Sequence, residues 1–415
     1  MCSENERARQ GASQDAGLRS AGPLPCLTVP SLLDLFLSFL RLGSVSFGGP
    51  GMVAYIRRLA VERRRWVSEQ DFQQGVALCQ AVPGATAMQC AAYVGLRARG
   101  VLGAVASYLG FGLPAFALML SLSAAYRHAL SIHAVSGALV GLRCLVVALV
   151  ANAAWAFGRS SCDALEHGVI AGVTAGLFLV GGSPFLIVVG TGLAGAILLR
   201  GPQPRPETGL VQTPGWGALR APGIALAVAA LLVATLLAFS GGLEALGLAM
   251  MKVDLFAFGG GFASVPLMYH EVVEKHAWMR PAVFMDGIAL GQVTPGPIVI
   301  TATFVGYQVA RLTGAVVSTV CVFLPSFLIV LLAEPWFRRL RSSPVFGAAV
   351  QGLLLSFVGL LASVTVQFAR VAPWSVPSGI IAAIALVALV RKVDVLWVVL
   401  AGAAASAALV PLISK

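Results

Sequence analysis

Charged side chains are scarce in this chain of 415 residues, where Asp, Glu, Lys and Arg together make up 11% of the sequence. A soluble protein averages about 25% charged residues. Hydrophobic residues make up 58%, the mean hydropathy is +0.88, and the stretches 168–180, 223–239 and 379–390 carry no charge at all. A soluble core cannot bury so many apolar residues, whereas a bilayer can. Because helices satisfy their own backbone in lipid, the composition predicts an all-α polytopic membrane protein.

Acidic residues are the scarcer charges, 17 against 28 Lys and Arg, which leaves a net charge of +11. The basic residues lie in short loops between apolar blocks, so we expect no nucleic-acid partner. The seven cysteines form no Cys-x-x-Cys pair, and the five histidines show no metal-ligand spacing. No nucleophile–base pair, carboxylate dyad or cofactor fingerprint is found either. We therefore predict no metal, no cofactor and no enzymatic activity.

The second half of the chain repeats the first at an offset of about 211 residues. Residues Phe47-Gly48-Gly49 match Phe258-Gly259-Gly260, and Leu113-Pro114 matches Leu324-Pro325. Between these blocks, Trp66, Gln80, Pro83 and Gly84 match Trp278, Gln292, Pro295 and Gly296. We predict a cytosolic tail over 1–30, a first repeat over 31–199, an exposed Pro- and Gly-rich linker over 200–221, and a second repeat over 222–415.

Equivalent loops of the two repeats differ in charge. The first loop holds Arg57, Arg58 and Arg63 to Arg65 against Glu62, whereas Glu271, Glu274, Lys275 and Arg280 of the second sum to zero. Lys and Arg mark cytoplasmic loops, so the first loop is expected inside and the second outside. The repeats are then inverted in a multi-pass membrane protein, a common transporter architecture.

The Phe-Gly-Gly and Pro-Gly segments allow two interpretations: each lies in a complete span, or in a hairpin that dips into the bilayer and returns. Hairpins place more of the Lys and Arg on the cytoplasmic side, which favours them. They would cover about 31–57, 72–96, 243–267 and 284–310. The remaining spans are predicted at 101–125, 130–157, 168–181, 184–199, 222–240, 314–334, 345–368, 376–390 and 395–412.

Gly and Pro inside apolar blocks break helices, which a membrane protein tolerates only where the backbone is packed in protein or lines a cavity. The N-terminus of a broken helix directs free amides and a positive dipole end at a ligand, which suits an anion. The alternative is that these breaks are kinks required for close helix packing. Because four such segments are paired by the repeat, we interpret them as a binding site: Phe47-Gly48-Gly49, Pro83-Gly84, Phe258-Gly259-Gly260 and Thr294-Pro295-Gly296-Pro297.

Three basic residues inside apolar blocks are candidate ligands of an anion. Arg41 and Lys252 are repeat equivalents, each six residues before its Phe-Gly-Gly segment, and Arg143 is the third. A cation near mid-membrane faces a cavity or a partner. Arg41 and Lys252 could face one dianion from opposite sides; alternatively each reaches the interface, or Lys252 pairs with Asp254. Gln80 and Gln292, three residues before each Pro-Gly, could donate amide hydrogens to an oxyanion or pack against a neighbouring helix.

Several of these strings resemble the chromate ion transporter family in its long, two-domain bacterial form. They are Ser46-Phe47-Gly48-Gly49-Pro50, the run Glu62 to Phe72, Pro83-Gly84, Phe258-Gly259-Gly260-Gly261 and Gln292-Val293-Thr294-Pro295-Gly296-Pro297. The resemblance covers roughly 30–410 and implies efflux of chromate across the bacterial inner membrane, with sulfate as a chemical analogue. The first repeat departs from the family by having Ala85 where Pro-Gly-Pro is usual.

The membrane potential sets the expected direction of transport. Moving one charge through 100 mV is worth about 2.3 kcal/mol, so an inside-negative potential favours exit of a dianion. We expect chromate efflux by alternating access, giving chromate resistance, and a homodimeric assembly. A transporter of another oxyanion such as sulfate, or an anion channel, remains the alternative.

Overall fold

The computed structural model describes residues 28–47, 51–199, 216–238, 241–337 and 343–413. Within these ranges the chain is helical and contains no strand, which confirms the predicted all-α class. Most of the predicted tail over 1–30, the linker up to residue 215, and Gly48 and Gly49 lie outside the described residues. Helix α8 (Trp216–Ala238) begins six residues before the predicted start of the second repeat.

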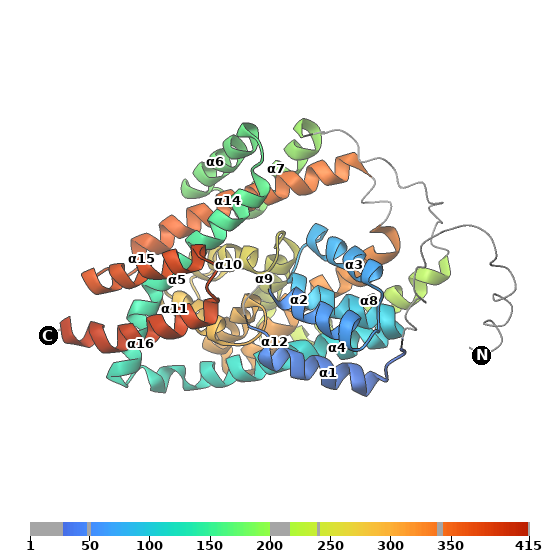
Figure 1. The fold of residues 1–415 in the computed structure, drawn as a ribbon, viewed down its shortest axis with the longest axis horizontal. Coiled ribbons are helices and arrows are strands. Elements are labelled where there is room, and N and C mark those ends of the chain that lie inside the picture. Colours follow the sequence, from blue (N-terminus) through green and yellow to red (C-terminus); the bar gives the residue numbers. More distant parts are fainter. Residues whose placement is uncertain (1–27, 48–50, 200–215, 239–240, 338–342, 414–415) are drawn as a thin grey trace, which may run out of the picture.

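The two repeats build the same order of elements (Figure 1). The first consists of α1 (Leu32–Val45), α2 (Gly51–Arg57), the π-helical turn η1 (Arg58–Arg63), α3 (Glu69–Ala81), α4 (Thr86–Ala129), α5 (His133–Ser161), α6 (Leu165–Leu179) and α7 (Pro184–Leu198). The second consists of α9 (Glu244–Leu255), α10 (Gly261–Tyr269), η2 (His270–Lys275), α11 (Pro281–Val293), η3 (Ile298–Ile300), α12 (Thr301–Ala333), η4 (Glu334–Trp336), α14 (Pro344–Val371), α15 (Val376–Val390) and α16 (Val395–Ile413). Even the π-helical turns recur, so the duplication extends to local backbone detail.

Local sequence explains where several helices begin. The Ser31 and Ser68 hydroxyls accept hydrogen bonds from the backbone N–H groups of Asp34 and Asp71, which caps α1 and α3. Proline occupies the first turn of α7, α11, α14 and α15, where its missing N–H costs no helical hydrogen bond. These signals fix starting positions that agree closely with the predicted spans.

Helix α4 is in fact two antiparallel arms. The Ser107 hydroxyl donates to Ala91 O over 2.7 Å, although residues 16 apart in a straight helix lie about 24 Å from each other. The chain reverses at Arg99 and Gly100, whose backbone angles are not helical. In α12 the hydroxyls of Thr303 and Thr319 lie 2.7 Å apart, and the reversal falls at the equivalent Ala310 and Arg311.

The contacts favour the hairpin interpretation for all four predicted segments. Gly75 of α3 packs on the Tyr93 ring of α4, and Gly287 of α11 packs on the Phe304 ring of α12, so each Pro-Gly lies at a hairpin tip. Helices α3 and α11 have 13 residues each, about 20 Å, which is too short for a bilayer core of about 30 Å. Likewise Arg64 forms an ion pair with Asp34, so the chain between them doubles back.

The two repeats interlock through their long helices. Gly141 of α5 packs against Ser406 of α16, and the equivalent Gly352 of α14 packs against Gly195 of α7. Small residues allow these helix backbones to approach closely, as in other membrane bundles. Each repeat therefore packs its terminal pair of helices on the long helix of the other repeat. Such reciprocal packing is expected of two repeats related by an approximate two-fold axis.

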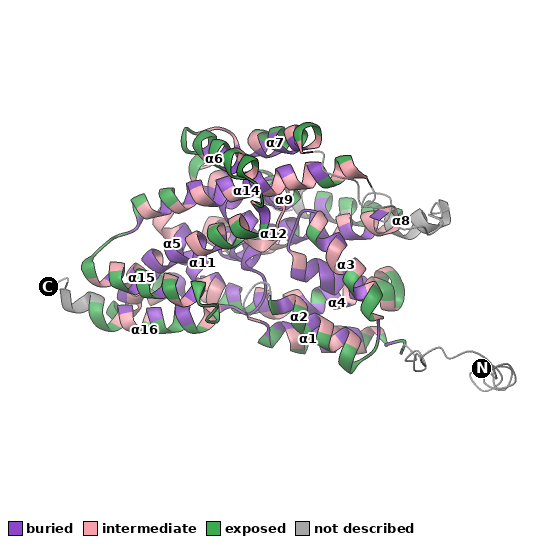
Figure 2. Cartoon of the chain, turned by 45° about the horizontal axis from the view of Figure 1, so that its top comes forward, coloured by how far each residue is buried: buried purple, intermediate pink, exposed green. Residues whose placement is uncertain are grey.

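The outer helices expose apolar surface, as expected of a protein in contact with lipid. Figure 2 shows exposed residues along α6, α7, α15 and α16 and buried residues along α5, α11 and α12. On α6 the exposed side chains Leu165, Val169, Val173 and Leu177 form one stripe. Segments 86–129, 133–161, 298–336 and 344–371 are each long and apolar enough to span a membrane, which confirms a multi-pass membrane protein.

Candidate functional site

The four hairpin tips meet in pairs across the repeats. Gly296 donates its backbone N–H to Ser46 O over 2.8 Å, and Gly84 donates its own to Ala257 O over 2.9 Å. Ser46 and Ala257 are equivalent residues next to the two Phe-Gly-Gly segments. Each Pro-Gly tip therefore binds the Phe-Gly-Gly tip of the other repeat. We call these four residues the repeat junction.

The glycines of the repeat junction are required by geometry. Gly84 and Gly296 have φ values of +121° and +104°, which L side chains rarely adopt. A methyl group on Gly84 would lie 2.2 Å from Ser326 Cβ, and one on Gly296 would lie 2.9 Å from Ala115 Cβ. Ala115 and Ser326 each follow the proline inside a long helix, so each tip also packs on the other repeat's kinked helix.

Helix N-termini converge beside the repeat junction. A methyl group on Gly260 would lie 3.3 Å from Thr86 Oγ1, and one on Gly261 would lie 3.9 Å from Ile298 N. Thus α10, α4 and η3 begin close together, and none of the three has a side-chain cap. Their first amides lack intrahelical partners, and their dipoles place positive charge there. This arrangement suits an anion, and the binding site inferred from the sequence stays a prediction.

The two predicted glutamines differ in their surroundings. The Gln292 Nε2 atom is buried and has no hydrogen-bond partner among the described residues, so an amide donor is left free inside the protein. Gln80, its repeat equivalent, is exposed. A third glutamine, Gln89, was missed by sequence reasoning: it is fully buried, and its Nε2 donates to Pro83 O over 2.6 Å, which fixes the first Pro-Gly tip.

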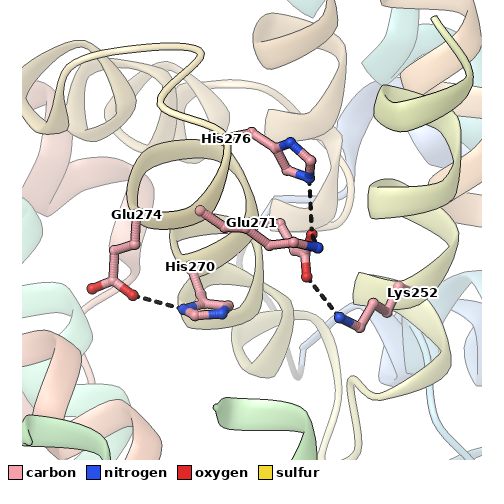
Figure 3. Close-up of polar contacts among 6 residues, drawn as sticks. Lys252, His270, Glu271, Glu274 and His276 are labelled. Atoms are coloured by element: carbon pink, nitrogen blue, oxygen red, sulfur yellow. Dashed lines mark hydrogen bonds and ion pairs between the residues drawn. The ribbon is translucent and has the colours of Figure 1, made fainter. Parts of the chain in front are cut away.

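Lys252 is held by a carboxylate rather than facing an open site (Figure 3). Its Nζ lies 2.8 Å from Glu271 Oε1 and 3.5 Å from the centre of the Phe185 ring. The partner is therefore Glu271 and not Asp254, the local partner considered from the sequence. Glu271 also binds Lys275 over 2.9 Å and lies 3.5 Å from His276 Nε2.

The other two predicted cations differ in their surroundings. Arg143 of α5 donates two hydrogen bonds of 2.7 Å to Asp286 of α11, which in turn accepts one from the Tyr126 hydroxyl over 2.6 Å. Arg41 is exposed on α1. In this conformation Arg143 and Lys252 are neutralised by carboxylates, so a dianion shared by Arg41 and Lys252 stays a prediction.

The Glu271 carboxylate organises the charged turn η2. Burial alone would raise the pKa of Glu271, but hydrogen bonds from Lys252 and Lys275 outweigh it and hold that pKa below its usual range. The neighbouring His270 Nδ1 lies 2.7 Å from Glu274 Oε2 (Figure 3). A cavity of about 480 Å³ opens beside this turn, lined by His270, Glu274, Lys275 and Gln367 among others. It contains none of the four hairpin tips.

Sequence reasoning placed none of three buried carboxylates at the candidate site, although it considered Asp254 as a partner of Lys252. Asp254, Glu271 and Asp286 are all fully buried, and Asp286 and Glu271 each pair with one of the predicted cations. A sequence signal existed, because each is an acidic residue close to or inside an apolar block. Their partners, however, come from other elements, and only the tertiary structure joins them.

Comparison with known proteins shows which family the chain belongs to. The model of the chromate transporter family matches it twice, over residues 33–196 and 244–407. The chain belongs to the chromate transporter family. The two matches confirm the predicted repeat, and membership makes the protein a transport protein rather than an enzyme, as predicted.

Relatives extend over nearly the whole chain. An uncharacterized transporter of Methanocaldococcus jannaschii is 41% identical over 89% of this chain and 92% of its own length. A chromate transport protein of Pseudomonas aeruginosa is 32% identical over 91% of this chain and 90% of its own. That of Cupriavidus metallidurans is 29% identical over 90% and 91%. No solved structure matches the chain significantly.

Proposed function

We propose that this protein exports chromate across the bacterial inner membrane by alternating access to a site at the repeat junction. The observation that carries the proposal is the convergence of uncapped helix N-termini at cross-bonded hairpin tips, with the free Gln292 amide near the second Pro-Gly. Such a site offers backbone and side-chain amide N–H donors to the oxygens of a tetrahedral anion, and needs no Lys or Arg side chain for this. Chromate as the substrate rests on the family and on the names of two relatives.

The reciprocal contacts also suit alternating access. Each tip is bonded to the other repeat, so a rotation of one repeat against the other would exchange these contacts as a unit. An inside-negative potential favours exit of a dianion by about 4.6 kcal/mol per 100 mV, twice the value for one charge. Export, with chromate resistance as its consequence, then needs only a selective path.

The first test is uptake of labelled chromate into everted membrane vesicles that contain the protein, with sulfate as competitor. We expect saturable uptake that increases with an inside-positive potential in these vesicles. Uptake of sulfate without chromate would assign the site to another oxyanion, and flux that does not saturate would indicate an anion channel. Saturable uptake without any response to potential would refute electrogenic export.

The matched pair Gln292→Ala and Gln80→Ala tests the position of the site. A hydrogen bond to a charged group is worth about 1.5–3 kcal/mol, so Gln292→Ala should raise the KM for chromate about 10-fold or more. The free energy of unfolding should change little, because Gln292 Nε2 has no described partner. The exposed Gln80 should tolerate the same change. Equal KM values for the two variants would place the site elsewhere.

A further inference from the structure

Asp254 of α9 is a buried carboxyl group that the proposed transport cycle has not yet used. Its side chain is fully buried, and its Oδ2 accepts the backbone N–H of Ser326 over 2.7 Å. Its Oδ1 is buried and has no hydrogen-bond partner among the described residues. Within the same ranges no Lys, Arg or His forms an ion pair with Asp254. Lys252, two residues away, is bound to Glu271 instead.

Asp254 lies against the repeat junction. Its partner Ser326 is the residue on which the Gly84 tip packs, and Gly84 itself binds Ala257, three residues after Asp254. The Tyr108 hydroxyl of α4 completes this cluster, donating to Phe323 O over 2.6 Å and lying 3.3 Å from Ser326 Oγ. A change in the charge of Asp254 would therefore act directly on the contact that joins the two repeats.

Packing does not explain why a carboxyl stands at this position. The repeat equivalent of Asp254 is Gly43, which packs α1 on α4 as α9 packs on α12. A methyl group on Gly43 would lie 2.3 Å from Phe111 O, so the first repeat forms the same helix contact with no side chain at all. The hydrogen bond from Ser326 N–H requires only an oxygen acceptor, not an ionisable group. A carboxyl at such a position inside a membrane protein is a candidate for function.

We propose that Asp254 is a proton-binding site whose proton moves together with the oxyanion, so that the protein is a proton-coupled transporter. This inference rests on the proposed function. A carboxylate beside a dianion repels it, so the dianion enters more readily when Asp254 Oδ1 carries a proton. The proton adds to the carboxylate on one side and leaves on the other. The transported pair then carries one net negative charge.

A metal cation fits Asp254 less well than a proton. Cations such as Ca²⁺ require about six or more oxygen ligands. The oxygens around Asp254 are already engaged, because Phe323 O accepts from Tyr108 and Ser326, and Ala257 O accepts from Gly84. No group of three metal-binding side chains is found among the described residues.

Other ionisable groups near α9 are accounted for. The described titratable side chains on the packed elements and on α9 itself are Glu244, Lys252, Tyr269, His270, Glu271, Glu274, Lys275, Tyr307, Arg311 and Cys321, with Tyr108 beside Ser326. None of these is bonded to Asp254, and Glu271 is bound by Lys252 and Lys275. The proton bound with the oxyanion is therefore assigned to Asp254.

The test uses the purified full chain in proteoliposomes with a pH-sensitive dye inside, at alkaline pH where chromate is a dianion. In the native protein we expect one proton to accompany each chromate, and the reversal potential to report one net charge. In Asp254→Asn the side chain is always neutral and cannot bind a proton. Chromate should still be transported, but each transport event should then move two net charges and no proton. Tyr108→Phe, which disturbs the same cluster without removing the carboxyl, should keep the coupling.

Each failure has its own signature. Absence of chromate and sulfate flux in the native protein would refute the proposed function, whereas flux without proton movement would refute the coupling alone. Proton movement that persists in Asp254→Asn, or flux that follows sodium instead of protons, would also overturn the role of Asp254. If Asp254→Asn does not fold, titration calorimetry of the native protein in two buffers still counts protons bound per oxyanion, and zero would refute the inference.

Discussion

At equivalent positions of the two repeats, Gly43 lies against α4 and Asp254 lies against α12, while Ala115 stands where the second repeat has Ser326. Lys252 binds a buried carboxylate and its equivalent Arg41 is exposed. Gln292 holds a buried free amide and Gln80 is exposed. The backbone hydrogen bonds of the repeat junction are nonetheless reciprocal. The duplication has therefore kept the geometry in both halves and concentrated the buried polar groups in the second.

Alanine at the two tip glycines should show the largest difference. Gly84→Ala combines a positive φ with a Cβ contact of 2.2 Å, so we expect a loss of about 3–5 kcal/mol in the free energy of unfolding. Gly296→Ala, with a contact of 2.9 Å, should lose less. Thermal unfolding in detergent measures both, with Gly168→Ala as control because a methyl group there meets nothing within 4 Å. Equal losses at both tips would contradict the asymmetry.

The Arg143–Asp286 pair should be the next most sensitive feature. Removing one member of a buried pair leaves an uncompensated charge, so Asp286→Ala should cost about 3 kcal/mol of stability. The double variant Arg143→Met with Asp286→Leu should recover most of this loss. A double-mutant cycle measures the coupling, and additive losses would show that the pair does not act as a unit.

Lys252→Ala and Arg41→Ala separate a structural cation from an exposed one. Because Lys252 is more than a third exposed and Glu271 keeps Lys275, we expect Lys252→Ala to lower stability by only about 1 kcal/mol. Arg41→Ala should stay within about 0.5 kcal/mol of the native protein. Chromate flux is measured on the same samples. Loss of flux in both would show that the two cations meet the substrate in another conformation.

Acid should remove slightly more stability from the loop around Glu271 in the second repeat than from the loop around Glu69 in the first. The pKa of Glu271 is lowered in the fold, so its contribution to stability is present at neutral pH and is lost as pH falls through the folded pKa. The pKa of Glu69 is also lowered, by its hydrogen bonds with Arg57 and Gln73, but its pair is exposed. Glu271→Gln should therefore reduce the fall in melting temperature at acid pH more than Glu69→Gln does. The melting temperature of each variant is measured as a function of pH. The reverse order would place the stronger charge network in the first repeat.

The amino-acid sequence alone was enough to predict the fold class, the repeat and the broken segments. Long uncharged stretches require a bilayer, and matched Trp, Gln, Pro and Gly residues reveal duplication because these types do not align by chance hydrophobicity. The positions of the hairpins were also predictable, since the Pro-Gly and Phe-Gly-Gly segments recur at equivalent places inside the apolar blocks of both repeats. Those signals are local, so they can be read along one chain.

Which hairpin tips touch and which charges pair could be learned only from the folded chain. The contacts of Ser46 with Gly296, Lys252 with Glu271, and Arg143 with Asp286 join residues from separate elements. Sequence spacing does not predict such pairs. Packing of one repeat against the other joins Ser46 with Gly296 and Arg143 with Asp286, and the reversal of the chain within the second repeat joins Lys252 with Glu271. The same holds for Asp254. Its neighbour Lys252 suggests an ion pair along the chain, but in the fold Asp254 accepts a hydrogen bond from Ser326 and forms no ion pair with any described residue.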